Sequence, residues 1–313
     1  MKRLISLFFA TSALSVAVLA QSSSASLGTA TSTSSGENKA SLSDMVGNKK
    51  FEENNEITDA KLKADAGSLS KYSLKFNLSY YGPTAGDLAA KDQPNPDGSV
   101  GSYETAISGS LGGRYRIDPK TTISMGSGLK LIHPFHGAER MDLNNPYLSY
   151  DMTNKMSGVQ MRNSFGVSYI TVPNYTKVGE FAGLSYDLSF NYDLGMSGFA
   201  VGLDGSLGYY LYKRDYVYSS DRFANRSSIS LYPTLKYNIS DKLNINTSPS
   251  LSYVNYRMNS DELTFVQKTV SQRVGVGYAF SRDIYIAPYI NFYPDRWTPD
   301  ATTLNISSSF SLL

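Results

Sequence analysis

The chain has 313 residues, a formal net charge of +2 at pH 7 and no cysteine. The near-balanced charge gives no basis for a nucleic-acid partner. Without cysteine, the sequence excludes disulfides, thiolate metal sites and lipid attachment through an N-terminal cysteine. The composition includes 24 Tyr, 14 Phe and 25 Gly together with many Ser, Asn and Thr, which is typical of a β-rich protein with many turns.

The N-terminus has the layout of a secretory signal peptide. Met1-Lys2-Arg3 is positively charged, residues 4–19 are mostly apolar, and Val18-Leu19-Ala20 resembles a cleavage site. We expect residues 1–20 to be removed; cleavage after Ala25 and a retained anchor helix are the alternatives. No later segment contains the roughly 18 consecutive apolar residues of a membrane-spanning helix. The remaining chain is therefore either a soluble exported protein or a membrane barrel that hides its apolar residues in alternation.

Residues 21–68 differ in composition from the rest of the chain. The tract 21–36 is rich in Ser, Thr, Gly and Ala and offers almost nothing to bury, so we expect disorder there. Residues 37–68 are charged and mixed, and 56–66 fits a short helix with a poor apolar stripe. We expect 21–68 to be disordered or partly helical, lying in the periplasm or folding into a barrel as a plug.

From Tyr72 onward the hydrophobic pattern has a period of two. Tyr72, Leu74 and Phe76 alternate with Ser73, Lys75 and Asn77. A helix repeats every 3.6 residues and cannot sustain this alternation, which predicts β-strands. The predicted strands are 70–81, 103–117, 121–132, 147–152, 159–170, 184–193, 199–211, 227–239, 243–253, 266–280, 284–293 and 302–312.

Short and long connections alternate along the whole series. The tight ones are 118–120, 153–158, 194–198, 240–242 and 281–282, and the long ones are 82–102, 133–146, 171–183, 212–226, 254–265 and 294–301. This alternation predicts that residues 69–313 form a closed antiparallel up-and-down transmembrane β-barrel of about twelve strands. In such a barrel short turns face the periplasm, so we expect both termini there.

The last strand carries a resemblance to a known class. Leu304, Ile306, Phe310 and Leu312 alternate with Asn305, Ser307, Ser309 and Ser311. This resembles the C-terminal assembly signal of bacterial outer-membrane β-barrel proteins of the porin-like class, although the final residue is Leu313 rather than Phe. The resemblance covers about residues 70–313 and matches no specific family. It implies the outer membrane of a Gram-negative cell, with membrane lipid and the barrel-assembly machinery as partners.

A soluble β-sandwich would also show alternation. The polar face, however, is built from small residues, as in Asn244, Asn246, Ser248, Ser250 and Ser252, where a soluble surface would carry many charges. Small side chains suit the interior of a closed barrel. Aromatic residues gather toward strand ends and predict two girdles at the membrane interfaces, among them Tyr80, Tyr81, Tyr209, Tyr210, Tyr212, Tyr278, Phe280, Phe292 and Tyr293. Pro233, Pro249 and Pro288 fall inside predicted strands and would need bulges or bends.

Residues that alternate with the apolar, lipid-facing ones should point into the barrel, and the charged residues among them are predicted to line the pore. The cations are Lys75, Arg114, Arg116, Lys130, Arg162, Lys236 and Arg273, and the anions are Glu104, Asp151, Asp187, Asp193 and Asp204. Asp204 and Arg273 are expected near mid-depth, and Asp151 with Arg162 as diagonal neighbours at one tight turn. These charges could sort solutes. Alternatively, neutralising pairs could fill a closed lumen.

The two histidines, His133 and His136, lie in one long loop with Glu139 and Asp142. A metal or acid–base site is conceivable there, but a polar loop is the simpler interpretation. The sequence holds no phosphate loop, dinucleotide fingerprint or hydrolase motif, and we expect no cofactor. The leading hypothesis is a passive pore or transporter for small hydrophilic solutes. The alternatives are a structural or adhesive surface barrel with a blocked lumen, and an outer-membrane lipid-modifying enzyme.

Overall fold

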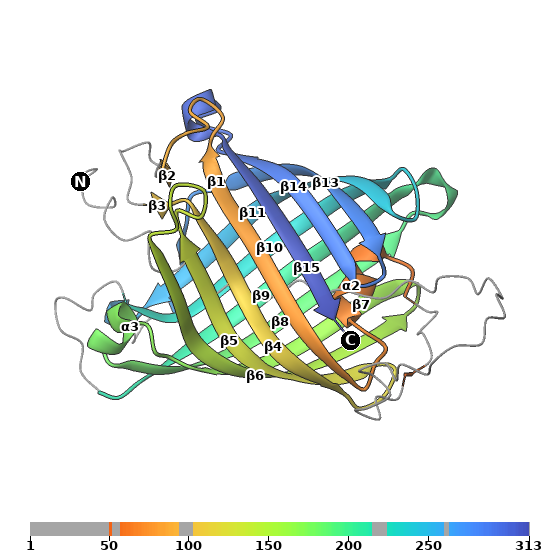
Figure 1. The fold of residues 1–313 in the computed structure, drawn as a ribbon, viewed down its shortest axis with the longest axis horizontal. Helices are drawn as coiled ribbons and strands as arrows, with labels where there is room; N and C mark the ends of the chain where they lie inside the picture. The colour runs from red at the N-terminus through yellow and green to blue at the C-terminus, as the bar shows by residue number, and fades with distance from the viewer. Residues whose placement is uncertain (1–49, 52–56, 94–102, 215–223, 260–262, 313) are drawn as a thin grey trace, which may run out of the picture.

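The computed structural model describes residues 50–51, 57–93, 103–214, 224–259 and 263–312. Within them, twelve long strands form one closed antiparallel barrel, as predicted (Figure 1). They are β1 (Tyr72–Thr84), β4 (Ala106–Arg116), β5 (Thr121–Ile132), β6 (Arg140–Met156), β7 (Val159–Tyr169), β8 (Glu180–Asp193), β9 (Phe199–Tyr212), β10 (Asn225–Asn238), β11 (Leu243–Tyr256), β13 (Ser271–Ser281), β14 (Ile284–Phe292) and β15 (Thr303–Leu312). Each strand pairs with its sequence neighbour, and the pairing of β1 with β15 closes the ring.

The two ends of the barrel differ. At one end, here called the turn end, short connections join β4 to β5, β6 to β7, β8 to β9, β10 to β11 and β13 to β14. The opposite loop end carries the longer connections, with a small hairpin of β2 (Asp92–Gln93) and β3 (Tyr103–Glu104), and helix α3 (Pro173–Lys177). A further helix, α2 (Ala60–Ala66), precedes the first strand. No helix of the described residues is long and apolar enough to cross a membrane.

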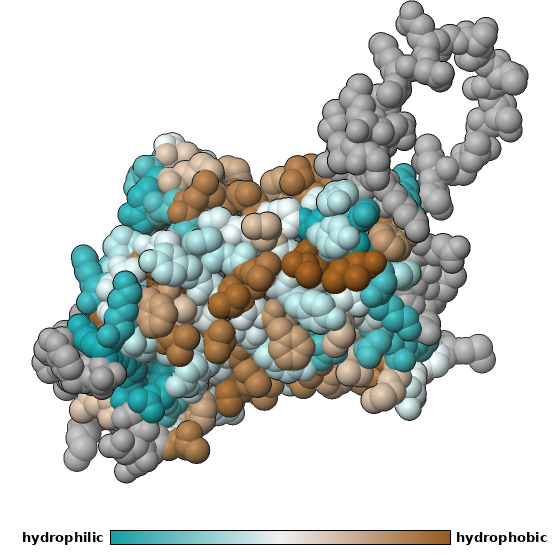
Figure 2. Space-filling model, turned by 90° about the horizontal axis from the view of Figure 1, so that it is seen from below, coloured by the Kyte–Doolittle hydropathy of each residue, from teal (hydrophilic) through white to brown (hydrophobic). Residues whose placement is uncertain are grey.

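The burial pattern is the reverse of that in a soluble domain. Inward polar side chains such as Ser110, Thr122 and Asn244 are almost fully buried, whereas the outward Met125 and Leu148 are exposed. Apolar side chains cover the middle of the outer face, and hydrophilic residues gather toward its two ends (Figure 2). A closed barrel with a polar lumen and exposed apolar side chains on its outer face is what a bilayer solvates. The chain is an outer-membrane β-barrel, and the soluble sandwich is excluded.

Outward aromatic pairs ring the turn end. The ring centroids of Phe199 and Tyr237 lie 4.9 Å apart, and those of Tyr278 and Phe280 lie 4.6 Å apart. Their rings suit the boundary between lipid and headgroups. The girdle prediction is wrong for Tyr81, Tyr210 and Tyr293, however, because these three residues line the interior.

The sequence placed the fourth barrel strand at 147–152, and this range is much too short. Strand β6 runs from Arg140 to Met156, so the turn that follows is only Ser157-Gly158 and the preceding loop ends at 139. The cause is a bulge opposite β5, where the register shifts between Gly126 and Gly128 and Asn145 adopts a φ of 47°. The bulge reverses the parity of outward residues, which hides the strand's first half from a search for strict alternation.

Other boundaries shift less. The predicted strand 266–280 is divided, because β12 (Val266–Gln267) pairs only with β11 and β13 starts at Ser271. Similarly, 103–117 consists of β3, which belongs to the small hairpin, and β4. Strand β8 starts at Glu180 and not at 184, which shortens the predicted loop 171–183.

The sequence predicts bulges or bends at the three internal prolines, and the structure shows no bulge at any of them. Between β10 and β11 the Cα partners Leu231–Leu251 and Leu235–Thr247 keep one register, and the ladder is interrupted between these two pairs. Pro233 and Pro249 occupy that interruption directly opposite each other. Each proline therefore lacks a ladder hydrogen bond at the same place, which costs less than two separate gaps. Pro288 likewise lies at an interruption between β13 and β14 without a register shift.

Candidate functional site

Helix α2 lies inside the barrel at the turn end (Figure 1). It contacts β7 on one wall and β13, β14 and β15 on the opposite wall. Lys61 Nζ is 2.5 Å from Asp204 Oδ2 on β9, and Asp59 Oδ2 is 2.5 Å from Lys236 Nζ on β10. The helix therefore spans the lumen and is tied to several strands by charge.

Asp59 both caps the helix and holds it to the wall. Its side chain accepts a hydrogen bond from the Leu62 backbone N–H, 2.9 Å away, which satisfies one unpaired donor of the first helical turn. Burial raises the pKa of the Asp59 carboxyl, but the Lys236 ammonium and the hydrogen bonds lower it, and the net pKa lies below its ordinary value. The carboxylate is thus held in its charged form.

Gln160 on β7 secures the chain just before the helix. Its Oε1 accepts hydrogen bonds from the backbone N–H groups of Thr58 and Asp59, at 2.7 and 2.9 Å. Its Nε2 donates to Asp193 Oδ2 at 2.8 Å and to Thr58 Oγ1 at 2.9 Å. Every polar atom of this side chain is therefore used to position the entry into α2, although no sequence signal marked Gln160 as special.

Two arginines of β4 hold the other end of the helix. Arg116 donates from Nε to Ser68 O at 2.8 Å and from a terminal nitrogen to Gly67 O at 2.8 Å. Arg114 donates to Ala66 O. The last carbonyls of a helix lack internal partners and carry the negative end of its dipole, so cations stabilise them there. These two residues were predicted to line the pore, and the structure places them beneath α2.

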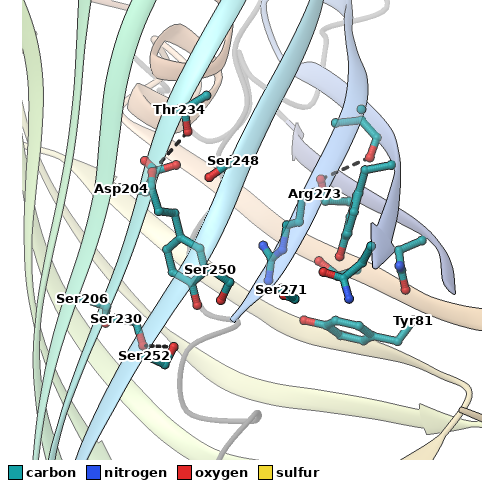
Figure 3. A pocket seen from close by; sticks show the side chains of 18 of the residues that line it. Tyr81, Asp204, Ser206, Ser230, Thr234, Ser248, Ser250, Ser252, Ser271 and Arg273 are labelled. Carbon is teal, nitrogen blue, oxygen red and sulfur yellow. Dashed lines mark hydrogen bonds between the residues drawn. The ribbon is translucent and has the colours of Figure 1, made fainter. Parts of the chain in front are cut away.

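Above α2 the lumen is hollow toward the loop end. The main cavity has a volume of 830 Å³, and Asp59, Lys61 and Leu62 form its floor. Its walls are rich in hydroxyl and amide groups, including Ser206, Ser230, Thr234, Asn246, Ser248, Ser250, Ser252, Ser271 and Asn305 (Figure 3). A second cavity of 120 Å³ lies nearer β6 to β9 and is lined by Lys75, Tyr147, Glu180 and Asp187 among others.

The structure brings half of the twelve predicted pore-lining residues to the main cavity: Glu104, Lys130, Asp187, Asp204, Lys236 and Arg273. Several of them are paired. Lys130 Nζ lies 3.0 Å from Glu104 Oε2. Lys75 is buried beside the smaller cavity, and Asp193 contacts Gln160. The predicted diagonal pair exists, because Arg162 and Asp151 form a buried ion pair at the turn end.

Arg273 on β13 lies between tyrosine rings, which its inward-facing position in the sequence pattern alone does not predict. Its guanidinium carbon lies 5.0 Å from the ring centroid of Tyr232 and 5.5 Å from that of Tyr289. Figure 3 shows the side chain reaching into the cavity, with the Tyr81 ring beyond its tip. The signal was available in the sequence, since Tyr232 shares the parity of Ser230 and Thr234.

The two histidines lie at the loop end, where His133 contacts a residue of its own loop and His136 reaches the segment that follows β1. His133 Nδ1 is 3.0 Å from Glu139 Oε2, and His136 Nε2 is 2.9 Å from Ala89 O. The hydrogen bonds from His133 and Lys91 lower the pKa of the Glu139 carboxyl. In the part of the chain that the structure describes, no group of three or more His, Asp or Glu side chains is arranged to hold a metal ion.

No protein-family model matches the sequence, and no curated protein matches it. Among solved structures the barrel is similar to a NanC porin, with 9% identity and a TM-score of 0.41 over 77% of this chain and 98% of the other. It is also similar to a KdgM porin in complex with disordered oligogalacturonate, with 9% identity and a TM-score of 0.42 over 77% of this chain and 99% of the other. An outer membrane channel from Pseudomonas putida F1 has 11% identity and a TM-score of 0.44 over 77% of this chain and 94% of the other. These similarities concern the architecture and carry no information about a solute.

Proposed function

We propose that the protein is a passive channel for small hydrophilic solutes, with its loop end outside the cell and its turn end in the periplasm. The observation that carries this proposal is the hydroxyl-lined cavity of 830 Å³ that occupies the barrel above α2. Small uncharged polar side chains leave room and offer hydrogen bonds without binding a solute strongly, which is what rapid passage requires. The chemistry of the wall therefore supports transport without catalysis.

In this proposal α2 is a plug that closes the channel at the turn end. The helix spans the lumen between opposite walls and is held by Asp59–Lys236, Lys61–Asp204 and the two arginines of β4. When α2 leaves, water can replace these polar and charged contacts, because the side chains of the barrel wall that contacted the helix are themselves polar. An apolar plug would expose a surface that water does not solvate.

The second candidate is a structural or surface barrel with a permanently blocked lumen. The same contacts favour it, since the buried ion pair Asp59–Lys236 and the half-buried pair Lys61–Asp204 tie α2 to the adjacent strands β10 and β9. The two functions differ in what removal of the segment does. A channel gains permeability, whereas a structural barrel whose loops also close the lumen does not.

Liposome swelling tests this proposal. Vesicles carrying the full-length protein, or the protein without residues 21–68, are diluted into iso-osmotic arabinose or into the larger raffinose. We expect the shortened protein to admit arabinose faster than the intact protein and to admit raffinose more slowly than arabinose. The channel would be rejected if vesicles with the full-length protein and vesicles with the shortened protein both swelled no faster in arabinose than vesicles without protein. Heat-modifiable migration in gels verifies that each barrel is folded.

A further inference from the structure

The cations of the lumen differ in how they are neutralised. Lys61 pairs with Asp204, Lys236 with Asp59, Lys130 with Glu104, and Arg162 with Asp151. Arg273 has no carboxylate within 4.0 Å among the described residues. Its neighbours are instead the faces of Tyr232 and Tyr289. Asp204 is already engaged by Lys61, so this arginine retains an unneutralised charge in a cavity.

The hydrogen-bonding capacity of Arg273 is also incompletely used. Its Nε is buried and has no hydrogen-bond partner among the described residues. A guanidinium has five N–H donors in a fixed planar fork, and that fork matches the two oxygens of a carboxylate. The flanking tyrosine rings hold the plane of the fork through cation–π contact and keep it extended from the wall. The group is thus oriented for a planar anion.

The surroundings favour a ligand with hydroxyl groups. Ser248 is the Cα partner of Arg273 on β11, and Asn291 is its partner on β14. Ser250 and Ser271 lie beside it, and Ser206, Ser230 and Ser252 form a row across the neighbouring strands β9, β10 and β11, here called the serine wall (Figure 3). Hydroxyl groups both donate and accept, so this wall can pair with the hydroxyls of a solute in several orientations.

We propose that Arg273, with Tyr81, Tyr232 and Tyr289, forms a binding site for small hydroxylated carboxylates in the main cavity. The carboxylate pairs with the guanidinium fork, and the serine wall binds the hydroxyl groups. This inference rests on the proposed function for its physiological meaning, because a solute that binds here would be one that the channel passes. The cavity extends from the site to loop-end residues such as Gln93 and Asn174. We therefore expect a solute to enter from the loop end with α2 in place, so that occupancy of the site does not require conduction.

Isothermal titration calorimetry of the full-length protein in detergent tests the proposal with gluconate as the probe. Sorbitol has the same carbon number but a further hydroxyl in place of the carboxylate, and acetate has the carboxylate without hydroxyls. We expect gluconate to bind measurably, acetate to bind more weakly and sorbitol to give no heat of binding. Similar affinities for sorbitol and gluconate, or no heat with gluconate, would overturn the proposal.

Substitutions locate the site. Arg273→Gln should weaken gluconate binding by about tenfold or more, because a charge-assisted pair is lost. Arg273→Lys should weaken it less, since the charge remains and the fork is lost. Arg140→Gln is the matched control: Arg140 also lines the cavity, but it is exposed and engaged by Asp142 at 2.8 Å. Equal loss in Arg273→Gln and Arg140→Gln would indicate general attraction of anions and contradict a site at Arg273. Liposome swelling is scored separately, so a binding protein that does not conduct refutes the channel and leaves the site standing.

Discussion

Asp59 and Lys236, 177 residues apart in the sequence, form a buried ion pair across the turn end of the lumen, with 2.5 Å between Oδ2 and Nζ. The same carboxylate caps α2. Loss of one partner of a buried pair costs about 3–5 kcal/mol, because the remaining charge is left without compensation. We therefore expect this pair to contribute more to the docking of α2 than the half-buried pair Lys61–Asp204 does.

The first prediction concerns this pair. Asp59→Asn should release α2, because Lys236 loses its counter-charge while the barrel strands are unchanged. Limited proteolysis should then cleave within residues 57–70 at a rate at least several-fold above that of the wild type. Asp241→Asn, at an exposed position of a tight turn, should behave as the wild type does. Equal resistance of Asp59→Asn and the wild type would show that the pair does not hold the helix.

The second prediction concerns pH. The pKa of Asp59 is lowered in the folded protein, so its contribution to docking is complete above its ordinary value of 3.8 and is lost as pH falls through the lowered value. Docking of α2 should be constant between about pH 5 and 8 and weaken below about pH 4. Hydrogen exchange of amides 60–66, corrected for the intrinsic effect of pH, measures this. A loss of protection already near pH 6, or the same acid step in Asp59→Asn, would exclude this carboxyl as the cause.

The third prediction concerns the lipid face. Leu203 and Ser206 lie on β9 with opposite parity, and Figure 3 shows the side chain of Ser206 in the cavity. Leu203→Arg should destabilise the barrel by about 2–4 kcal/mol, as for a cation at the bilayer midplane. Ser206→Arg should cost much less, because the lumen is polar. Urea titrations in lipid vesicles measure both, and equal losses would contradict the facing of β9.

The fourth prediction concerns orientation. The chain has no cysteine, so introduced thiols react without background. Asp300→Cys, in the loop-end connection between β14 and β15, should react with a membrane-impermeant thiol reagent in intact cells. Asp241→Cys, at the turn end, should react only after the outer membrane is permeabilised. The reverse pattern would invert the proposed topology.

Much of the barrel followed from the sequence, because period-two alternation and alternating connection lengths report strand positions directly. The exception is instructive. A bulge at Asn145 changes which positions point outward. Before it the odd-numbered Met141 and Leu143 face the lipid, and after it the even-numbered Leu148 does. A strict pattern search ends where the phase changes, even though the strand continues.

The site was less predictable. The alternation along a strand shows whether a side chain points into the lumen or toward lipid, but it does not show which residue that side chain contacts. The pairing of Arg162 with Asp151 was foreseen, since both flank one tight turn. The pairing of Lys236 with Asp59 was not, because the short helix has a poor apolar stripe and no local signal for where it docks. Residues 1–49, with the predicted signal peptide and the whole Ser-rich tract 21–36, lie outside the described residues.

The central claim is that a polar channel runs through this barrel and that α2 closes it at the turn end. Single-channel conductance in planar bilayers tests it most directly, with the full-length protein compared with the protein that lacks residues 21–68. We predict that the shortened protein conducts steadily and that the full-length protein conducts less. Absence of conductance from a folded, heat-modifiable barrel without residues 21–68 would contradict the channel, and equal conductance of the two proteins would contradict the plug.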